Sequence, residues 1–329
     1  MNHSTFNEGG TTKTEALLLS LVVPVFNEFD TVNLFLETIE STFKERPDLE
    51  LEIVFVNDGS SDNTLEKLVL LQKSYPAIRI VDLSRNFGKE AALTAGLQEC
   101  RGQVVVPIDV DLQDPPEIIL NMLDRWREGY EVVVGRRTSR NSDTWAKKTS
   151  AKWFYKIHNK LSDRKIPENV GDFRLLDRNV VDALNNLHES RRFMKGLFAW
   201  IGFKTTTIDY VRPERVAGDS KFNSWRLWNF ALEGLTSFTT APLRLWTYVG
   251  LVVALFSLIF AAAIVIRVLI YGIDVPGYAS LVVAITLLSG IQLIGIGIIG
   301  EYLGRAYIES KRRPVYVIRK IYESLESKL

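Results

Sequence analysis

Apolar runs that alternate with helical patterns constrain this chain more than any other feature. Five strand-like runs lie in the first part of the chain, at residues 17–25, 51–56, 78–83, 103–108 and 131–134. Helix-like stretches separate them, at residues 31–43, 63–74, 89–99 and 116–128. Runs that stay apolar, instead of alternating with polar residues, are typical of strands buried on both faces. The alternation therefore predicts an α/β domain with a mostly parallel sheet and helices on both of its faces.

The pattern is weaker between residues 145 and 238. Residues 145–161 and 191–201 favour helices, and residues 173–176 and 204–211 favour strands. Residues 222–238 mix Trp and Phe with charged side chains, which is typical of a helix lying at a membrane interface.

Two long runs without any charged residue follow, at residues 245–266 and 275–300. Each is long enough to cross the hydrocarbon core of a bilayer, which takes about 20 residues in a helix. The alternative is a hairpin buried in a soluble core, but soluble helices are seldom free of charge over such a length. We therefore predict two transmembrane helices.

The distribution of basic residues predicts how these helices are oriented. The connection at residues 271–278 contains no Lys or Arg. The outer flanks carry Arg226, Arg244, Arg305, Lys311, Arg312, Arg313, Arg319 and Lys320. Because basic flanks stay on the cytosolic side, both termini and the α/β domain are expected in the cytosol, with the protein in the cell (inner) membrane.

These patterns divide the chain into five parts. They are a loose N-terminal tail at 1–16, the α/β domain at 17–221, juxtamembrane helices at 222–244, two transmembrane helices at 245–304 and a basic cytosolic tail at 305–329. The N-terminal tail is polar and lacks the apolar core of a signal peptide.

Composition excludes several classes of function. The formal net charge of the 329 residues is +1, which gives no argument for binding nucleic acid. Cys100 is the only cysteine, so no disulfide can form within the chain. The histidines, His3, His158 and His188, are too scattered to predict a zinc site.

The segment from Asp109 to Gln113 carries the strongest chemical signal. Asp109 and Asp111 follow the apolar run at 103–108, so both carboxylates lie at the end of a strand. Carboxylates in this arrangement can share one hard cation, Mg²⁺ or Mn²⁺. Substrate phosphates usually complete the coordination of such an ion, so the segment predicts a diphosphate substrate.

Two other strand ends are acidic, at Glu28 and Asp58. Taken alone, the second has a structural explanation, because Ser61 or Asp62 could cap the following helix. Asp114 likewise precedes Pro115 and Pro116, a common start of a helix. Three acidic strand ends in one sheet still favour a shared site, because clustered carboxylates repel one another unless cations or donors meet them.

Glycines in the second apolar run produce a misleading pattern. Gly295, Gly297 and Gly300 match the Gly-x-Gly-x-x-Gly spacing of dinucleotide-binding proteins, but they do not follow a strand, so we reject that function. Gly300 and Gly304 have the spacing that lets helices approach closely, which favours packing of the two spans or of two protomers.

Four motifs together resemble one enzyme family. They are Val25-Phe26-Asn27-Glu28, Asn57-Asp58-Gly59-Ser60, Asp109-Val110-Asp111-Leu112-Gln113 and Gly171-Asp172-Phe173-Arg174. In this order they resemble the family 2, GT-A-type glycosyltransferases. With the two apolar runs, nearly the whole chain is similar to polyprenyl-phosphate sugar transferases, a group that includes dolichol-phosphate mannose synthases and bacterial bactoprenol glucosyltransferases.

The resemblance implies a donor site for a nucleotide sugar. Pro24, Glu28 and Asp58 would hold the nucleoside, with Asp58 at the base. Asp109 would lie near the ribose and the metal, and Asp111 and Gln113 would complete the site of Mg²⁺ or Mn²⁺. The segment from Arg215 to Lys221 resembles the family's Arg-x-x-Gly-x-Ser-Lys loop, so Arg215 and Lys221 would contact the diphosphate.

The resemblance also implies an acceptor site for a lipid phosphate. Arg137, Lys147, Lys148 and Ser220 would bind that phosphate. The alternative for these cations is a solvated face near anionic lipids.

Asp172 leaves two roles open. The family pattern suggests a general base near the acceptor. However, a phosphate monoester has a second pKa of about 6 and needs no base to act as a nucleophile at neutral pH. Asp172 would then orient Arg174 or the acceptor instead.

The expected function is inverting transfer of one hexose, glucose for preference, from a UDP-sugar to polyprenyl (undecaprenyl) phosphate. GDP-mannose and a UDP-aminoarabinose remain alternative donors, and an inactive membrane scaffold or lipid carrier is the alternative outside enzymes. A processive polysaccharide synthase is disfavoured, because its Gln-x-x-Arg-Trp element is absent and residues 192–200 occupy that region. A homo-oligomer formed through the transmembrane and juxtamembrane helices is also possible.

Overall fold

The structure is a computed structural model that describes residues 16–138, 170–211 apart from 188, 190, 191 and 193, 241–271 and 277–323. Several predicted features lie outside these residues. They are most of the N-terminal tail, the helix at 145–161, the interfacial helix at 222–238, and the side chains of Lys147, Lys148, Arg215, Ser220 and Lys221.

One sheet of eight strands forms the body of the molecule, in the order β7-β5-β6-β4-β1-β2-β3-β8. The strands are β1 Leu17–Val25, β2 Leu49–Asn57, β3 Ile78–Leu83, β4 Val104–Pro107, β5 Val132–Arg137, β6 Val170–Asp177, β7 Thr205–Tyr210 and β8 Ile318–Tyr322. β1 pairs in parallel with both β2 and β4, β2 with β3, and β5 with β7. β6 and β8 pair antiparallel with their neighbours. The prediction of a mostly parallel sheet is confirmed.

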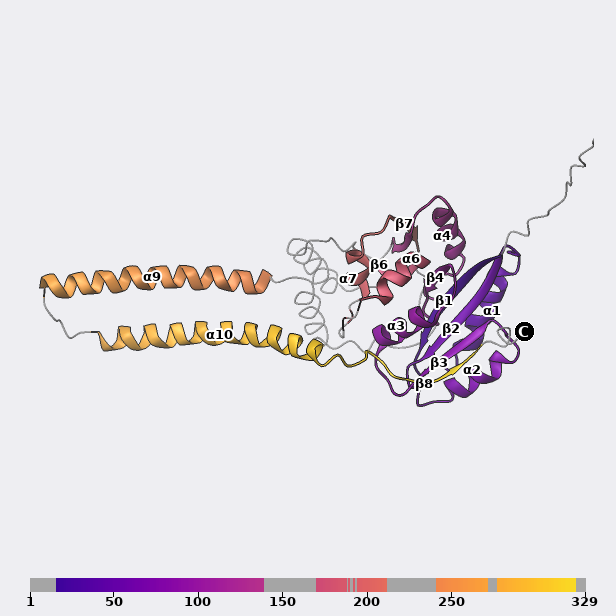
Figure 1. Cartoon of the computed structure of the whole chain (residues 1–329), viewed down its shortest axis with the longest axis horizontal. Helices are drawn as coiled ribbons and strands as arrows, with labels where there is room; N and C mark the ends of the chain where they lie inside the picture. Colours follow the sequence, from indigo (N-terminus) through magenta and orange to yellow (C-terminus); the bar gives the residue numbers. More distant parts are fainter. Residues whose placement is uncertain are drawn as a thin grey trace, which may run out of the picture.

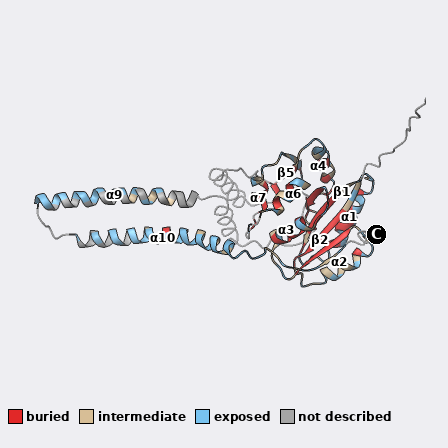
Figure 2. Cartoon of the chain, viewed as in Figure 1, coloured by how far each residue is buried: buried red, intermediate tan, exposed pale blue. Residues whose placement is uncertain are grey.

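Helices cover both faces of this sheet, as the alternation predicted. They are α1 Val32–Phe43, α2 Thr64–Gln72, α3 Lys89–Glu99, α4 Ile118–Arg127, α6 Arg178–Asn185 and α7 Met194–Trp200. One core contains Phe35 of α1 and Met122 of α4, and the other contains Leu93 of α3 and Val181 of α6. Figure 2 shows the strands as the buried centre of the body.

The strand order reverses at β1, and this reversal decides where ligands can bind. The chain runs outward from β1 through β2 to β3 and then returns to place β4 on the other side of β1. α3 makes this return and packs on the face opposite to α1 and α2. A crevice opens at such a reversal, beyond the carboxyl ends of the strands. The ends of β1 and β4 therefore border the expected ligand site.

Gly96 allows α3 to lie close to the sheet. A Cβ atom at this position would collide with Val22 Cγ1 of β1 and would lie 3.0 Å from Val56 Cγ2 of β2. No side chain larger than hydrogen fits between the helix and the strands. The close approach brings the first turn of α3 to the edge of the crevice.

The C-terminal segment differs from its prediction as a basic tail at 305–329. Residues 305–310 belong to a helix, and β8 adds an antiparallel strand to the edge of the sheet beside β3 (Figure 1). Gln72 fixes the end of this strand, since its Nε2 donates to the carbonyls of Tyr322 and Glu323 at 3.1 and 3.0 Å. The sequence was misleading because Arg319 and Lys320, both exposed within β8, interrupt its apolar pattern.

Two long helices follow, α9 Ala241–Tyr271 and α10 Tyr278–Ser310. α9 extends beyond the predicted run 245–266 at both ends, whereas α10 begins three residues after the start of the predicted run 275–300 and continues ten residues beyond its end. Figure 1 shows them side by side, projecting from the α/β body. Trp246 of α9 packs directly on Gly295 of α10. Among the atoms that the structure describes, none lies within 4 Å of a Cβ built at Gly300 or Gly304, so packing at these two glycines, between the spans or between protomers, stays a prediction. Among the residues that the structure describes, no helix has both the length and the apolar character that crossing a membrane requires.

Candidate active site

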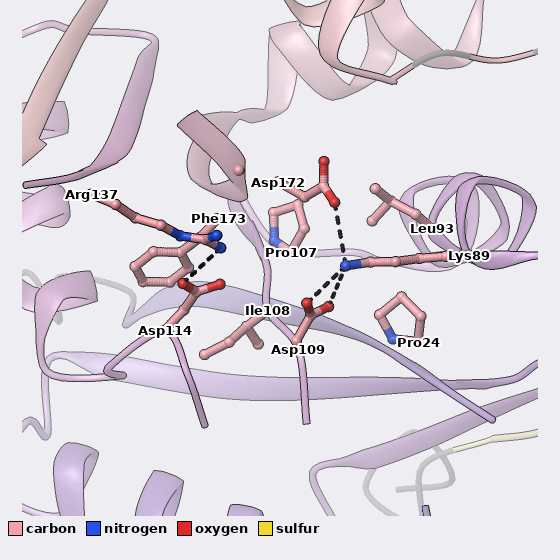
Figure 3. A pocket seen from close by; sticks show the side chains of 11 residues that line it. Pro24, Lys89, Leu93, Pro107, Ile108, Asp109, Asp114, Arg137, Asp172 and Phe173 are labelled. Carbon is pink, nitrogen blue, oxygen red and sulfur yellow. Dashed lines mark hydrogen bonds and ion pairs between the residues drawn. The ribbon is translucent and has the colours of Figure 1, made fainter. Parts of the chain in front are cut away.

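A cavity of about 230 Å³ lies at the carboxyl ends of β1 and β4 (Figure 3). Four of the predicted site residues line it together: Pro24 at the end of β1, Asp109 after β4, Arg137 at the end of β5 and Asp172 on β6. These residues come from four strands, and the strand order brings them together at the edge where the crevice was expected. Lys89, Asp114 and Phe173 also line the cavity.

Lys89 is the central cation of the cavity, and the sequence did not single it out. Its Nζ lies 2.7 Å from Asp109 Oδ1 and 2.8 Å from Asp109 Oδ2. The same Nζ lies 3.3 Å from Asp172 Oδ2. Burial alone would lower the pKa of Lys89, but the two carboxylates outweigh burial and raise that pKa above its usual value. The side chain is therefore a permanent positive charge between two anionic groups.

Arg137 is held by a second cluster at the other side of the cavity. Its Nε donates to the Tyr210 hydroxyl at 3.1 Å, and its Nη2 donates to Asp114 Oδ1 at 3.3 Å. The Tyr210 hydroxyl also donates to Asp114 Oδ1, in a short hydrogen bond. Burial lowers the pKa of Arg137, but Asp114 and Tyr210 more than offset this effect. The guanidinium therefore enters the cavity charged and fixed in direction.

Asp114 thus has a further role beside starting a helix before Pro115. Its residue is only 3% exposed, so its carboxylate depends on the two donors that contact it. Tyr210 lies on β7, a strand that pairs with β5 across a long connection. Burial and the nearby Asp114 carboxylate raise the pKa of Tyr210, which keeps the phenol protonated as a donor.

Arg174 is nearly buried behind Asp172. Its guanidinium lies 3.8 Å from the ring centre of Phe198, and its Nη2 donates to the Gly171 carbonyl at 2.6 Å. Burial lowers the pKa of Arg174 to about 10, and the negative charge of Asp172 opposes that decrease. The two residues interact electrostatically, while the ammonium group that contacts Asp172 at 3.3 Å belongs to Lys89.

Asp58 and Glu28 lie beside the cavity and do not line it. Asp58 is 3% exposed, and its two oxygens accept N–H groups from Phe87 at 2.7 Å and Gly88 at 2.9 Å. Burial raises the pKa of Asp58, and these two donors oppose the increase. Glu28 Oε2 accepts the Thr31 hydroxyl at 2.8 Å. Contact of either residue with a nucleoside stays a prediction.

The loops that carry Glu28 and Asp58 are joined to each other. The side-chain oxygen of Asn27 accepts the N–H of Ser61 at 2.8 Å, and the N–H of Glu28 donates to the Thr64 hydroxyl at 3.0 Å. Asn27 adopts a φ of 56°, a left-handed conformation that asparagine tolerates. The ends of β1 and β2 thus form one connected surface.

Asp111 and Gln113 form a tight turn after Asp109. The N–H of Gln113 donates to Asp111 Oδ1 at 3.2 Å, and Leu112 between them has a φ of 53°. The Gln113 residue is 6% exposed. The turn gives Asp111 a fixed backbone close to Asp109.

Comparison with known proteins identifies the family of this chain. The model of the family "Glycosyl transferase family 2" matches residues 20–184. The chain is 51% identical over 303 residues to "Prophage bactoprenol glucosyl transferase homolog" of Escherichia coli (strain K12), covering 92% of this chain and 99% of that protein. It is 52% identical over 301 residues to "Bactoprenol glucosyl transferase" of Shigella phage SfV, covering 92% of this chain and 98% of that protein.

The chain belongs to glycosyltransferase family 2. Among solved structures, it is similar to the mannosyltransferase PcManGT of Pyrobaculum calidifontis, with 19% identity and a TM-score of 0.47 over 90% of this chain and 87% of that chain. That structure is a complex with GDP-Man and Mn²⁺.

The carboxylate oxygens in the site of this glycosyltransferase suit a hard divalent cation. Asp109 and Asp111 provide two carboxylates on one turn, and Mg²⁺ is often bound by only one or two carboxylates together with substrate phosphates. Within the described ranges, no group of three or more His, Cys, Asp or Glu side chains could hold a metal by itself. An ammonium group already contacts Asp109, which shows that this position accepts a cation.

The residues that sequence reasoning missed in this glycosyltransferase are Lys89, Asp114 and Tyr210. Lys89 does carry a signal, because it follows a glycine at the junction between a strand end and a helix, where ligand-binding groups gather in α/β sheets. Asp114 was noticed only as part of a helix start. Tyr210 carries no local signal, because its neighbours depend on the pairing of β5 with β7.

Replacement of Asp58 by Asn tests whether its two hydrogen bonds stabilise the loop before α3. An amide side chain offers one acceptor oxygen, so its NH₂ group would face one of the two backbone donors. We expect Asp58→Asn to lower the free energy of unfolding by about 1–3 kcal/mol, the usual cost of a buried unsatisfied group. Thermal unfolding of the purified protein measures the loss.

Asp62→Asn is the matched control for this substitution. Asp62 Oδ1 accepts the N–H of Thr64 at 3.1 Å, and the amide oxygen of asparagine can accept the same bond. Its effect should stay within about 0.5 kcal/mol. Equal effects of the two substitutions would contradict a special role for Asp58 in holding the loop.

Proposed function

We propose that this glycosyltransferase moves a single glucose from UDP-glucose to polyprenyl phosphate at the cytosolic face of the membrane. The observation that carries the proposal is the similarity to bactoprenol glucosyl transferases, at 51% and 52% identity over 92% of this chain. That similarity extends beyond the α/β body, because it covers far more than the residues 20–184 of the family model.

The charge of the cavity suits a reaction between two anions. The donor carries a diphosphate on its anomeric carbon, and the phosphate of the acceptor must approach that same carbon. Lys89 and Arg137 supply positive charge on two sides of the cavity (Figure 3). Fixed cations placed where negative charge gathers can stabilise a transition state without reorganising at that moment.

Arg137 is the proposed contact for the acceptor phosphate. Its Nε and Nη2 are engaged by Tyr210 and Asp114, so the guanidinium is already oriented before any ligand arrives. An oriented, planar group binds a phosphate more specifically than a flexible ammonium does. Asp114 and Tyr210 are therefore positioning residues for the acceptor site.

The transfer itself needs one displacement. An oxygen of the lipid phosphate attacks the anomeric carbon while the bond from that carbon to the UDP oxygen breaks, which inverts the configuration. Asp172 lies on the acceptor side beside Arg174, where it orients the acceptor and has no need to remove a proton from a dianionic phosphate. Asp109, Asp111 and Gln113 would hold Mg²⁺ or Mn²⁺. When bound, the metal would neutralise charge on the leaving diphosphate.

We further propose that α9 and α10 form a transmembrane hairpin that brings the enzyme to its lipid substrate. The support comes from the full sequence of these helices, since residues 245–266 and 275–300 carry no charged side chain. Large apolar side chains are also exposed along both helices, for example Phe256 at 69% and Ile296 at 64%. Exposed apolar surface on this scale is typical of contact with lipid or another apolar surface.

A panel of labelled nucleotide sugars tests the proposed reaction. The purified full-length protein is incubated with polyprenyl phosphate, Mn²⁺ and labelled UDP-glucose, GDP-mannose or UDP-aminoarabinose. We expect label in the lipid product from UDP-glucose alone, and loss of that product in EDTA with recovery on adding Mg²⁺ or Mn²⁺. Labelling from GDP-mannose or UDP-aminoarabinose instead would correct the sugar, and no product from any donor would favour a scaffold or lipid carrier.

Arg137→Ala tests the acceptor site, and Arg136→Ala is its matched control. Arg137 would lose a charge-assisted contact worth about 1.5–3 kcal/mol, so kcat/KM for the lipid should fall by roughly ten- to a hundredfold. Arg136 is the preceding residue of the same strand, and it pairs with the exposed Asp209 at 2.6 Å instead of lining the cavity. Arg136→Ala should leave kcat/KM within about twofold of the wild type, since exposed pairs contribute little.

Isothermal titration with UDP separates the two substrates in these variants. Affinity for UDP should be nearly unchanged in Arg137→Ala, because this side chain is assigned to the acceptor. A collapse of UDP binding in Arg137→Ala would place Arg137 at the donor. Arg137→Lys should recover only part of the activity, because a lysine cannot reproduce the planar guanidinium.

Cysteine labelling tests the proposed orientation in the membrane. Cys100, the only native cysteine, is buried, so background labelling of intact cells should be low. A cysteine introduced as Gly277→Cys or Ser280→Cys should react with an impermeant reagent added from outside. Labelling that requires permeabilised cells would reverse the orientation and would place the active site away from the cytosolic nucleotide sugar.

A further inference from the structure

Lys89 occupies a position that helix energetics do not explain. It is the first residue of α3, directly after the N-cap Gly88. The N-terminus of a helix carries partial positive charge, which favours Asp and Glu there and disfavours Lys. α3 does have an acidic first-turn residue, Glu90, and it therefore gains nothing from a lysine beside it. The reason for Lys89 must lie in what its ammonium contacts.

The backbone before Lys89 is fixed so that the side chain points into the cavity. Gly88 has a φ of 98°, a left-handed conformation that side chains with a Cβ rarely adopt. The carboxylate of Asp58 accepts the N–H groups of Phe87 and Gly88, which lead into this bend. Because Gly96 also lets α3 approach the sheet, the whole first turn is directed at the ends of β1 and β4.

The ammonium of Lys89 joins the donor side of the cavity to its acceptor side. Its Nζ contacts both carboxylate oxygens of Asp109, at 2.7 and 2.8 Å, and lies 3.3 Å from Asp172 Oδ2. Figure 3 shows Lys89 entering between these two carboxylates. Asp109 follows β4 and Asp172 lies on β6, which are neighbouring strands. One cation thus balances two carboxylates that the proposed function assigns to different substrates.

A divalent cation at Asp109 is incompatible with this arrangement. A Mg²⁺ ion bound to a carboxylate oxygen lies at about 2.0–2.1 Å from it. Since Nζ lies within hydrogen-bond distance of both Asp109 oxygens, a metal there would lie next to the ammonium charge. Like charges at such short distance repel strongly, so Nζ must leave Asp109 before a metal can bind. Asp172 remains as the partner that keeps Lys89 inside the cavity.

Resting on the proposed function, we propose that Lys89 is a positioning residue that exchanges with the divalent cation. Before the donor binds, its ammonium takes the place of the metal at Asp109. When the metal and the nucleotide sugar arrive, the ammonium moves toward Asp172 and holds that carboxylate for the acceptor. No covalent bond forms or breaks in this exchange, and Lys89 stays protonated throughout.

Direct titration of Mn²⁺ tests the exchange without using enzyme activity. The full-length protein, free of nucleotide, is titrated with Mn²⁺, and free Mn²⁺ is measured by electron paramagnetic resonance. Lys89→Met removes the competing charge while keeping a side chain of similar length. We expect this variant to bind Mn²⁺ roughly three- to tenfold more tightly than the wild type, as fits a partly exposed ion pair.

Two further variants separate competition from a general change in structure. Lys89→Arg keeps a cation at the position and should bind Mn²⁺ within about twofold of the wild type. Lys204→Met removes a lysine that lies over the ring of Tyr130, outside the residues that line the cavity, and should also match the wild type. Equal affinities in Lys89→Met and the wild type, or an equal gain in Lys204→Met, would overturn the proposal.

Transfer kinetics at saturating Mn²⁺ test the second half of the exchange. Lys89→Met should lower kcat by about tenfold with little change in KM for UDP-glucose, because Asp172 loses its contact with the Lys89 ammonium, and Lys89→Arg should restore most of kcat. Unchanged turnover in Lys89→Met would remove the role at Asp172. If the wild type transfers no glucose at all, the proposed function fails, whereas the Mn²⁺ titration still decides whether Lys89 competes for Asp109.

Discussion

The parallel pairing of β1 with β4 is the constraint on which the active site depends. Val22 of β1 lies opposite Pro107 of β4, so both strands end at the same edge of the sheet. The connection through α3 reverses the strand order there, and a crevice opens at such a reversal. Asp109, Arg137 and Asp172 meet at this edge although they are distant in sequence. Catalytic geometry is thus a consequence of how the sheet is wound.

Charge balance then determines which side chains can share that crevice. Asp109, Asp114 and Asp172 are three carboxylates in one small cavity, and they would repel one another without cations. Arg137 and Lys89 balance this negative charge in different ways. Arg137 is tied to the buried Asp114 and Tyr210, so its position does not depend on a ligand. Lys89 contacts two carboxylates, and its ammonium stands at the end of a flexible side chain. The ammonium can therefore move when the charge around it changes. A site for two anionic substrates can use both a fixed and a movable positive charge.

The parts that sequence predicted well are those governed by local patterns. The continuous apolar runs gave β1 and β3 with their bounds, and the helix at 89–99 agrees with α3. Of the predicted site residues, Pro24, Asp109, Arg137 and Asp172 line one cavity, whereas Glu28 and Asp58 do not. Tyr210 escaped prediction because it reaches Arg137 only through strand pairing between residues 73 positions apart. β8 was not predicted, because exposed edge strands tolerate cations. A sequence of this kind therefore resembles a solvated tail.

The C-terminal strand gives the helical hairpin a defined relation to the catalytic body. α10 ends at Ser310, and β8 begins at Ile318 on the edge of the sheet. The guanidinium of Arg319 in β8 lies 3.6 Å from the carboxylate of the buried Asp82. That carboxylate also accepts a hydrogen bond from Asn57 at 2.7 Å, and Asn57 directly precedes Asp58 in the chain. The hairpin is therefore fastened to the side of the sheet that carries the proposed nucleoside contacts. If the hairpin lies in the bilayer as proposed, this attachment limits how far the cavity can move from the membrane surface. An acceptor whose phosphate stays at that surface needs such a limit, because its oxygen must reach the anomeric carbon of a donor bound in the body.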